Sequence, residues 1–262
     1  MSETLALYLR ELKLPTMLAQ AQPQAIVATR EGWTHMQYLN HLAELELQER
    51  RQRRIDRWRR ESALPPSKTK TTLELAKLPP AVRSQFPILC EGAFVEHAHN
   101  VLAFGLPGRG KTHLLCAIGH ELIRQGQRVL FTPAYQLVQR LLEAKQQLRL
   151  ERLLQRLDLF AAVIIDDIGY IQQHRDEMEV LFTFLAQRYE RKSVMISSNL
   201  VFSQWDRIFK DPMTTAAAID RLVHHAIILE MTGPSQRTQA AMSKQTHDYS
   251  TAQQENTLSE KT

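Results

Sequence analysis

The stretch GLPGRGKT, from Gly105 to Thr112, constrains the fold of this chain more than any other. It has the form G-x-x-x-x-G-K-T and lies between a short apolar run, NVLAFG, and an amphipathic stretch, KTHLLCAIGHELIRQG. Glycines let such a loop curl until its N–H groups face an anion, and the next helix N-terminus adds positive potential. A strand, this loop and a helix in succession predict a phosphate-binding loop in an α/β domain.

The residue types in this phosphate loop point to a nucleotide with a metal ion. Lys111 supplies a point charge for β- and γ-phosphates, and the Thr112 hydroxyl is a ligand for Mg²⁺. The other candidates for nucleotide contacts are Gly105, Pro107, Gly108, Arg109, Gly110 and His113. The motif therefore predicts ATP and Mg²⁺ as cofactors.

The run VIIDD supplies the carboxylate that a phosphate loop needs on a second strand. Asp166 is the candidate that orders Mg²⁺ through its water shell. Asp167 takes the position where many ATPases carry a glutamate that orients the attacking water. Aspartate is one methylene shorter, and a misplacement of about 1 Å can cost about 10²-fold in rate. We expect Asp167 to be a slow catalytic residue, and the alternative is a partner that only supports Asp166.

A further apolar run ends in MISSNL, and its last polar residues are candidates for the same site. We expect Asn199, with Ser198 as the second choice, to reach the γ-phosphate or the attacking water. The alternative is an asparagine that caps the following turn.

The layout of the 262 residues favours an α/β core behind a helical segment. Strand-like runs (NVLAFG, RVLFTP, AAVIIDD, SVMISSN) alternate with helical patterns, which predicts a parallel sheet covered by helices on both faces. The preceding part reads as helical, with a first helix that ends at Pro15 and a capping-box pattern at Thr34 and Gln37. We expect a helical N-terminal domain at 1–64, a linker at 65–85, an ATPase domain at 86–240 and a polar, disordered tail at 241–262.

Composition narrows the class of protein. The hydrophobic fraction is 44% and the net charge is +5, which suits a globular protein and is compatible with a polyanionic partner. No apolar run is long enough to span a membrane. Cys90 and Cys116 have neither disulfide nor metal-ligand spacing, so we expect reduced core residues and a cytoplasmic protein.

The motifs occur in the order seen in AAA+ ATPases. The combination of GKTHLL, IIDDIGY, SSNL and IDRLVHHA, with LRELKLPTM near the start, resembles the IstB family of transposition helper ATPases. DnaC helicase loaders are close relatives of that family, and DnaA initiators are more distant ones. The resemblance covers about Leu5 to Arg237. It implies a P-loop AAA+ core, with a parallel sheet flanked by helices, preceded by a small all-helical N-terminal domain.

The resemblance also implies roles for two arginines and a shared site. Arg221 matches the arginine finger that a neighbouring subunit inserts, which would place ATP at the interfaces of a homo-oligomer. An arginine on the surface of an amphipathic helix is the alternative. Arg237 occupies the sensor 2 position, although Gln236 stands where the family more often has a tyrosine.

Two basic regions compete as DNA contacts. The resemblance places a helical insertion of the initiator and loader clade around Lys145, Arg149 and Arg152, facing the channel of the assembly. The other region, RRQRRIDRWRR, contains Arg54 and Arg57. Solvated helix faces are the alternative for both, and the second region could instead dock a transposase or a sister subunit. No base-reading motif is present, so we expect phosphate contacts that tolerate any sequence.

These observations predict an ATP-controlled helper that oligomerises on double-stranded DNA and recruits or stimulates a cognate transposase. A DnaC-like helicase loader shares the same core and stays an alternative, as does a module that binds ATP without hydrolysing it. A small-molecule kinase is less compatible with Asn199, Arg221 and the leading helical domain.

Overall fold

The computed structural model describes residues 2–170, 175–200, 204 and 212–232. The chain divides into two compact units, Met1–Trp58 and Arg59–Thr262. The predicted tail, 241–262, lies outside the described residues.

The N-terminal unit contains α1 (Glu3–Glu11), α2 (Pro15–Glu31) and most of α3 (His35–Glu61). The prediction that the first helix ends at Pro15 is wrong: α1 ends at Glu11, and Pro15 begins the separate helix α2. Proline suits the first position of a helix because its missing N–H needs no partner there. The capping box before α3 is confirmed: the Thr34 N–H donates to Gln37 Oε1 at 2.8 Å, and the Gln37 N–H donates to Thr34 Oγ at 3.2 Å.

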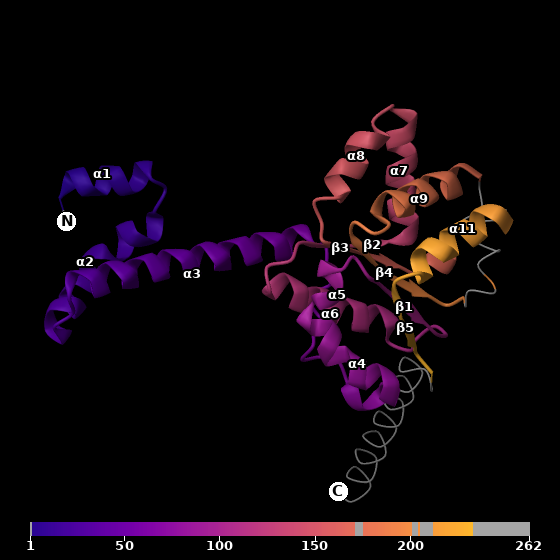
Figure 1. The fold of residues 1–262 in the computed structure, drawn as a ribbon, viewed down its shortest axis with the longest axis horizontal. Coiled ribbons are helices and arrows are strands. Elements are labelled where there is room, and N and C mark those ends of the chain that lie inside the picture. Colours follow the sequence, from indigo (N-terminus) through magenta and orange to yellow (C-terminus); the bar gives the residue numbers. More distant parts are fainter. Residues whose placement is uncertain (1, 171–174, 201–203, 205–211, 233–262) are drawn as a thin grey trace, which may run out of the picture. The chain divides into compact units, whose positions relative to one another are not determined.

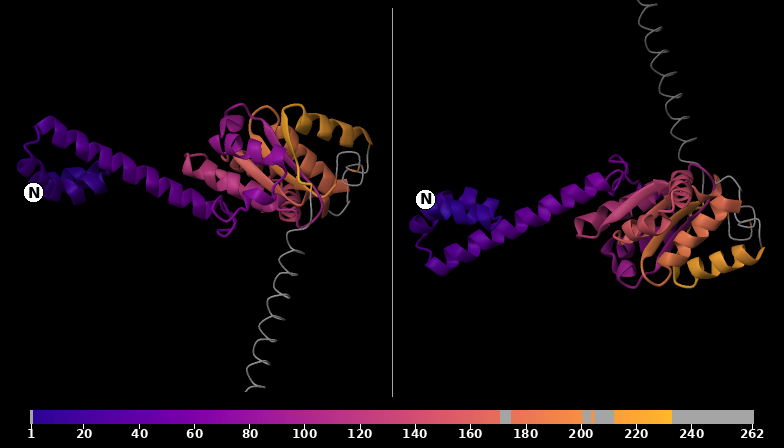
Figure 2. Two further views of the ribbon diagram at one scale, coloured as in Figure 1. Left: turned by 90° about the horizontal axis from the view of Figure 1, so that it is seen from below. Right: turned by 90° about the horizontal axis from the view of Figure 1, so that it is seen from above.

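A buried carboxylate joins α2 to α3 within this unit. Glu46 of α3 is buried and accepts the N–H groups of Thr16 and Met17, at 2.8 and 3.0 Å, in the first turn of α2. Its other oxygen accepts from Arg50 at 2.9 Å. Burial alone would raise the pKa of Glu46, but the Met17 N–H and the Arg50 guanidinium outweigh it and hold the pKa below its usual value. Figure 2 shows α2 folded back on α3, to which it is joined by these hydrogen bonds.

The second unit is built on a five-stranded sheet in which all the described strand pairs are parallel. The order is β2-β3-β4-β1-β5. The strands are β1 (Asn100–Phe104), β2 (Val129–Pro133), β3 (Ala162–Asp166), β4 (Ser193–Ser198) and β5 (Ala226–Glu230). The first four confirm the predicted strands, whereas β5 was not predicted.

Helices cover both faces of the sheet, as predicted. On one face lie α4 (Pro80–Glu91), α5 (Ala93–Glu96) and α6 (Lys111–Arg124). On the other lie α7 (Ala134–Gln146), α8 (Leu150–Leu157), α9 (Arg175–Arg188) and α11 (Pro212–Val223). Two short 3₁₀ turns are Leu75–Lys77 and Ile168–Tyr170. Figure 1 shows the two layers, and the core between the sheet and α7, α8 and α9 is formed by buried leucine, isoleucine, valine and phenylalanine side chains.

The segment predicted as a linker, 65–85, falls within the second unit and packs on α6. Leu64 lies against Gly119 of α6, and the carbonyl of Pro65 accepts from His120 at 3.1 Å. Leu73, Leu78 and Val82 are buried further along. Burial of each of these apolar side chains stabilises the fold by roughly 1.5–3 kcal/mol. The prolines and small polar residues around them made the segment resemble a linker, so this packing was not predicted. The division between the units falls within α3.

Two smaller expectations can also be compared with the structure. Cys90 and Cys116 are buried free thiols, and burial raises their pKa values to about 11 and about 12. They are therefore unreactive core residues. None of the helices in the described part of the chain combines the length and apolar character needed to cross a membrane.

Candidate functional site

The phosphate loop leaves the carboxyl end of β1 and curls into α6. Gly105 has φ 150°, and a Cβ there would collide with the backbone oxygen of Met231 beyond β5. Gly108 and Gly110 have φ values of 81° and 86°, which side chains of L-residues disfavour. The Gly105 N–H donates to the carbonyl of Ser198 at 3.2 Å, so the loop begins beside the end of β4. The glycines are therefore required by both curvature and close approach.

Lys111 begins α6 and is buried. Its ammonium donates to the carbonyls of Gly105 and Leu106, at 2.6 and 3.1 Å, so it points back into the loop that is predicted to hold phosphates. Thr112 follows in the first turn of α6, half-buried. This arrangement agrees with the predicted contacts of the Lys111 ammonium and the Thr112 hydroxyl with a nucleotide bound at the N-terminus of α6.

The remaining loop candidates lie differently. Pro107 is exposed at the tip, and Arg109 is half-buried with an Nε that has no hydrogen-bond partner within the described residues. His113 does not face the loop: its Nε2 lies 3.1 Å from both the Thr69 carbonyl and the Thr72 hydroxyl. That contact binds the 65–85 segment to the first turn of α6, which gives His113 a structural role.

The two aspartates at the end of β3 are joined by a serine of β4. The hydroxyl of Ser197 donates to Asp166 Oδ1 at 2.6 Å and accepts the Asp167 N–H at 2.8 Å. Asp167 has φ 58°, a left-handed conformation in which aspartate is better tolerated than most residues. Since Ser197 is fully buried, it fixes the direction of the Asp166 carboxylate, while the backbone turns sharply at Asp167.

Asn199 follows β4 at the same edge of the sheet. Its Oδ1 is buried against Gly169, where a Cβ would collide with it, and has no hydrogen-bond partner in the described part of the chain. A buried amide oxygen without a donor is costly, by roughly 1–3 kcal/mol, unless a ligand or water supplies one. Ser198 instead closes its own turn, with its hydroxyl bonded to the N–H and carbonyl of Leu200 at 3.0 and 2.8 Å. Asn199 therefore fits the predicted role better than Ser198.

Arg221 lies at the opposite edge of the sheet. It belongs to α11, whose Leu222 carbonyl accepts from Asn100 at 3.1 Å, and Asn100 begins β1, whereas the phosphate loop follows the end of β1. The length of β1 therefore separates the Leu222 carbonyl from the phosphate loop by on the order of 13 Å. The guanidinium of Arg221 lies 4.8 Å from the ring centroid of Phe182, and its Nη1 has no hydrogen-bond partner among the described residues. Arg221 is thus far from its own phosphate loop, and Arg237 lies outside the described residues.

The predicted DNA contacts around α7 and α8 separate into two groups. Lys145 is paired with Glu179 of α9 at 2.9 Å and with Asp176 at 3.8 Å. Arg149 and Arg152, in contrast, line a cavity of about 300 Å³ between α7 and α8. The cavity lining is Arg140, Glu143, Ala144, Gln147, Arg149, Arg152, Leu153 and Arg156.

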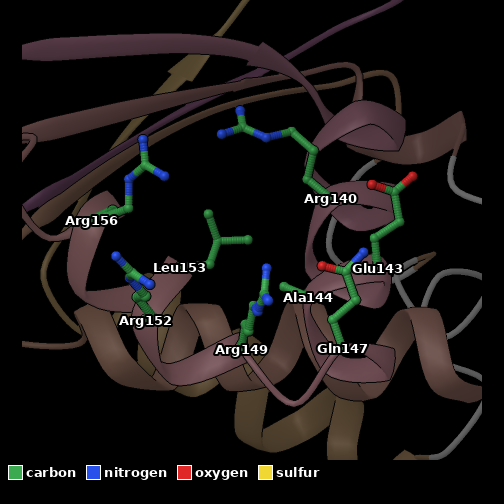
Figure 3. A pocket seen from close by; sticks show the side chains of 8 residues that line it. All are labelled: Arg140, Glu143, Ala144, Gln147, Arg149, Arg152, Leu153 and Arg156. Atoms are coloured by element: carbon green, nitrogen blue, oxygen red, sulfur yellow. The ribbon is translucent and has the colours of Figure 1, made fainter.

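Four guanidinium groups surround this arginine cavity. Figure 3 shows Arg140, Arg149, Arg152 and Arg156 around one opening, with Leu153 between them. Within the described residues none of the four arginines has an ion pair or a side-chain hydrogen bond. A single carboxylate, that of Glu143, accompanies them. Such a concentration of unpaired planar donors matches phosphate oxygens.

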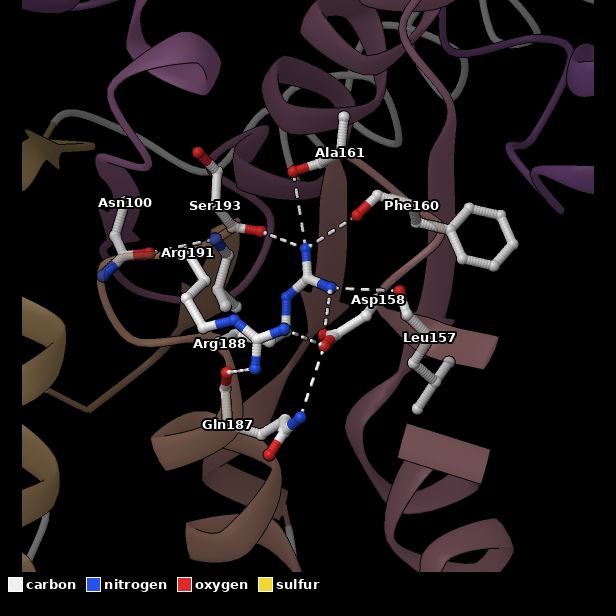
Figure 4. Close-up of polar contacts among 10 residues, drawn as sticks. Asn100, Leu157, Asp158, Phe160, Ala161, Gln187, Arg188, Arg191 and Ser193 are labelled. Carbon is white, nitrogen blue, oxygen red and sulfur yellow. Dashed lines mark hydrogen bonds and ion pairs between the residues drawn. The ribbon is translucent and has the colours of Figure 1, made fainter. Parts of the chain in front are cut away.

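A buried arginine fixes the far end of α8. The side chain of Arg188, 1% exposed, donates to the carbonyls of Leu157, Phe160 and Ser193 at 2.9–3.1 Å and lies 3.7 Å from Asp158. Figure 4 shows these bonds converging from α8, the following loop and β4. Burial lowers the pKa of Arg188 to about 10, so the side chain stays charged at neutral pH. It therefore ties one wall of the arginine cavity to the strand that carries Ser197.

The second basic region lies on α3. The guanidinium of Arg54 lies 5.8 Å from the ring centroid of Trp58, and Arg57 is exposed without an ion pair in the part of the chain that the structure describes. Arg50 and Arg53 serve the N-terminal unit itself, since both pair with Glu46. The predicted residues Arg54 and Arg57 are therefore accessible, and neither lines the arginine cavity.

Comparison with known proteins decides the family. The model of the IstB-like ATP-binding proteins matches residues 7–244. The chain belongs to the IstB-like ATP-binding protein family. An insertion sequence ATP-binding protein of Sinorhizobium fredii is 43% identical over 93% of this chain and 82% of its own. The IS21 ATP-binding protein of Pseudomonas aeruginosa is 34% identical over 89% of this chain and 88% of its own.

Solved structures share the fold of the core of this IstB-like chain. DnaA from Aquifex aeolicus, solved with AMPPCP, matches with a TM-score of 0.56 at 18% identity, over 71% of this chain and 56% of that one. DnaI matches with a TM-score of 0.52 at 22% identity, over 66% and 94%. These likenesses concern the fold alone. The chain is an ATP-binding protein with the AAA+ ATPase fold, as the resemblance implied.

Three residues of the two candidate sites in this IstB-like chain were not predicted from the sequence: Ser197 beside Asp166, and Arg140 and Arg156 in the arginine cavity. Ser197 was passed over in favour of its neighbours, although the register that places Ile165 opposite Ile196 brings the next pair, Asp166 and Ser197, together. Arg140 and Arg156 were not among the predicted DNA contacts. Their spacing on two separate helices gave no sign that they converge with Arg149.

Proposed function

We propose that this IstB-like protein is an ATP-dependent AAA+ ATPase that binds double-stranded DNA with little sequence preference and oligomerises on it. In this proposal it acts as a transposition helper that selects or remodels target DNA and recruits or stimulates its cognate transposase. The insertion-sequence names of its relatives support the context. ATP would lie at the interfaces between subunits.

The observation that carries DNA binding is the arginine cavity. A nucleic-acid backbone presents phosphates at regular spacing, and guanidinium forks bind such oxygens two at a time. Arg140, Arg149, Arg152 and Arg156 offer four forks around one opening of about 300 Å³. The cavity walls present no planar aromatic side chain on which an unpaired base could stack, and stacking is the usual mode for single strands. This favours the backbone of a duplex.

The nucleotide site fits ATP and Mg²⁺. The glycine cradle of the phosphate loop and the Lys111 ammonium suit the phosphates, whereas Thr112 and Asp166 are the residues that would hold Mg²⁺. Bound there, Mg²⁺ would neutralise charge on the β- and γ-phosphates. Asn199, whose Oδ1 has no hydrogen-bond partner among the described residues, would contact the γ-phosphate or the attacking water.

Asp167 and Arg221 complete the proposed hydrolysis. The Asp167 carboxylate would orient the attacking water as a general base with a short reach, which makes hydrolysis slow. Arg221 would stabilise charge on the phosphoryl group in the site of a neighbouring subunit, an effect worth about 10³–10⁵ in rate for arginine fingers. Its distance from its own phosphate loop is what supports action on a neighbour.

The test measures DNA affinity against salt concentration. Fluorescence anisotropy with a labelled duplex and a non-hydrolysable ATP analogue gives the slope of log K against log salt. The double variant Arg149→Gln/Arg152→Gln should make that negative slope shallower by about 1.8 per subunit, because each lost phosphate contact removes about 0.9 from its magnitude. Lys145→Gln is the matched control, since its cation is already paired with Glu179, and it should change the slope little.

Two outcomes would contradict the proposal. An unchanged slope in the double variant would remove the arginine cavity from the DNA interface. Tighter binding of a single strand than of the duplex would favour the helicase-loader alternative, which uses the same core.

A further inference from the structure

Four histidines gather at the edge of the sheet opposite the phosphate loop. His97 and His99 precede β1, and His224 and His225 precede β5. The ring centroids of His224 and His225 are 4.1 Å apart, and His99 stacks on His225 at 5.4 Å with an interplanar angle of 11°. His97 follows at 5.7 Å from His99. Neither the nucleotide site nor the arginine cavity uses these imidazoles.

A carboxylate completes the cluster. Glu190, just beyond the end of α9, has an oxygen 3.9 Å from His224 Nδ1 and 3.9 Å from His225 Nε2. One ligand atom from each of these three residues lies within 4.8 Å of the others. All three side chains are exposed, so an ion can reach them from solvent. Glu190 has φ 57°, and this left-handed turn brings the chain back toward the histidines.

We propose that Glu190, His224 and His225 form a binding site for a divalent transition metal of the Zn²⁺ class. Two imidazole nitrogens and one carboxylate oxygen are a donor set that Zn²⁺ accepts, with a fourth position left to water. Bonds of about 2.0–2.2 Å in tetrahedral geometry separate ligand atoms by about 3.3–3.6 Å. The Glu190 oxygen lies 3.9 Å from each imidazole nitrogen, and the ligand atoms of the two histidines lie within 4.8 Å of each other, so all three separations approach the tetrahedral spacing.

Neighbouring side chains shape this site. The Tyr189 hydroxyl lies 3.1 Å from His224 Nδ1, the same nitrogen that faces Glu190. The metal would therefore replace Tyr189 as the partner of that nitrogen. The stacked ring of His99 holds the plane of His225, which reduces the ordering that binding requires.

The site would act on the helix that carries Arg221. Glu190 follows α9, and His224 and His225 follow α11, so one ion would join the ends of the two helices. The same helices already meet where the Arg221 guanidinium packs over Phe182 of α9. Bound metal would thus hold the Arg221 helix at a second point and add positive charge to that face.

The test uses the metal-free full chain without a polyhistidine tag. Titration with Co²⁺, followed by absorption and then by Zn²⁺ displacement, should show one ion per chain in a site of low coordination number. Glu190→Gln and His225→Asn should each weaken binding by about 10-fold or more, because each removes one of three protein ligands. Tyr189→Phe should strengthen it by removing the competing hydroxyl. His35→Gln, a histidine outside the cluster, is the control and should bind as the wild type does.

ATP binding by each variant reports whether the core is folded, because the nucleotide site lies at the other edge of the sheet. A wild-type chain that binds no Co²⁺ or Zn²⁺ would overturn the proposal. So would equal binding by the wild type and by folded Glu190→Gln and His225→Asn variants. If those two variants fail to bind ATP, Tyr189→Phe alone decides, and unchanged or weaker binding by it counts against the site.

Discussion

Replacement of Ser197 by alanine should raise the Mg²⁺ concentration that ATP hydrolysis requires, without affecting the phosphate loop. The hydroxyl that is removed donates to Asp166 at 2.6 Å and accepts the Asp167 N–H at 2.8 Å. The first bond is charge-assisted, and loss of the second leaves a half-buried N–H without that acceptor. Together these losses predict about 2–4 kcal/mol less stability. The Asp166 carboxylate would no longer be held in one direction.

The functional magnitude follows from the supporting role of Ser197. Loss of a hydrogen bond that orients a metal-binding carboxylate typically costs about 10–100-fold in metal affinity or activity. ATP hydrolysis should therefore need about 10–100-fold more Mg²⁺ in Ser197→Ala to reach half of its maximum rate. The assay is ATP hydrolysis titrated with Mg²⁺ at saturating ATP and DNA.

Ser198→Ala is the matched control. Ser198 is the adjacent residue of β4 and equally buried, but within the described residues its hydroxyl bonds only to the backbone of Leu200. It should lose some stability and keep the wild-type Mg²⁺ requirement. Identical Mg²⁺ curves for Ser197→Ala and Ser198→Ala, or an unchanged requirement in Ser197→Ala, would refute the role assigned to the Asp166–Ser197 bond.

Two other predictions concern the framework. Arg188→Met should destabilise the second unit by about 3–5 kcal/mol in thermal unfolding, because buried carbonyls lose a charged donor. Arg191 is exposed, so Arg191→Met should cost under about 1 kcal/mol. Equal losses of stability in the two variants would contradict this prediction. The lowered pKa of Glu46 means that its carboxylate stabilises the N-terminal unit above the usual glutamate pKa, and that this contribution disappears as pH falls through the lowered value. Hydrogen-exchange protection of the first turn of α2 should therefore fall on acidification in the wild type. The Glu46→Gln variant should show low protection at all pH values. Wild-type protection in that variant at neutral pH would contradict the role assigned to Glu46.

Features fixed by neighbouring residues were predictable from the sequence. The capping box of Thr34 and Gln37 depends on a spacing of three residues, and the phosphate loop depends on one strand, one turn and one helix. Both were confirmed, as were the parallel sheet and its first four strands. β5 is as long as β1, β2 and β3, and it was missed because it follows the turn at His224 and His225 without a glycine or proline to mark it.

Features that depend on which elements become neighbours were not predictable. A slip of one residue in the β3–β4 register would place Ser198, not Ser197, against Asp166, and no local signal fixes that register. Lys145 seemed as available as Arg149 until the packing of α7 on α9 placed Glu179 beside it. The segment 65–85 has the composition of a linker, but its residues Leu73 and Leu78 are buried within the second unit.

In the proposed mechanism, Arg221 acts on the nucleotide of a neighbouring subunit. Lys111→Ala removes the phosphate-loop cation, and Arg221→Ala removes the finger, so each variant alone should hydrolyse almost no ATP. Mixed in equal amounts on duplex DNA, they should recover about a quarter of the wild-type rate, since about one interface in four then joins an intact loop to an intact finger. A mixture as inactive as its components, or an Arg221→Ala protein with the wild-type rate, would contradict the shared site.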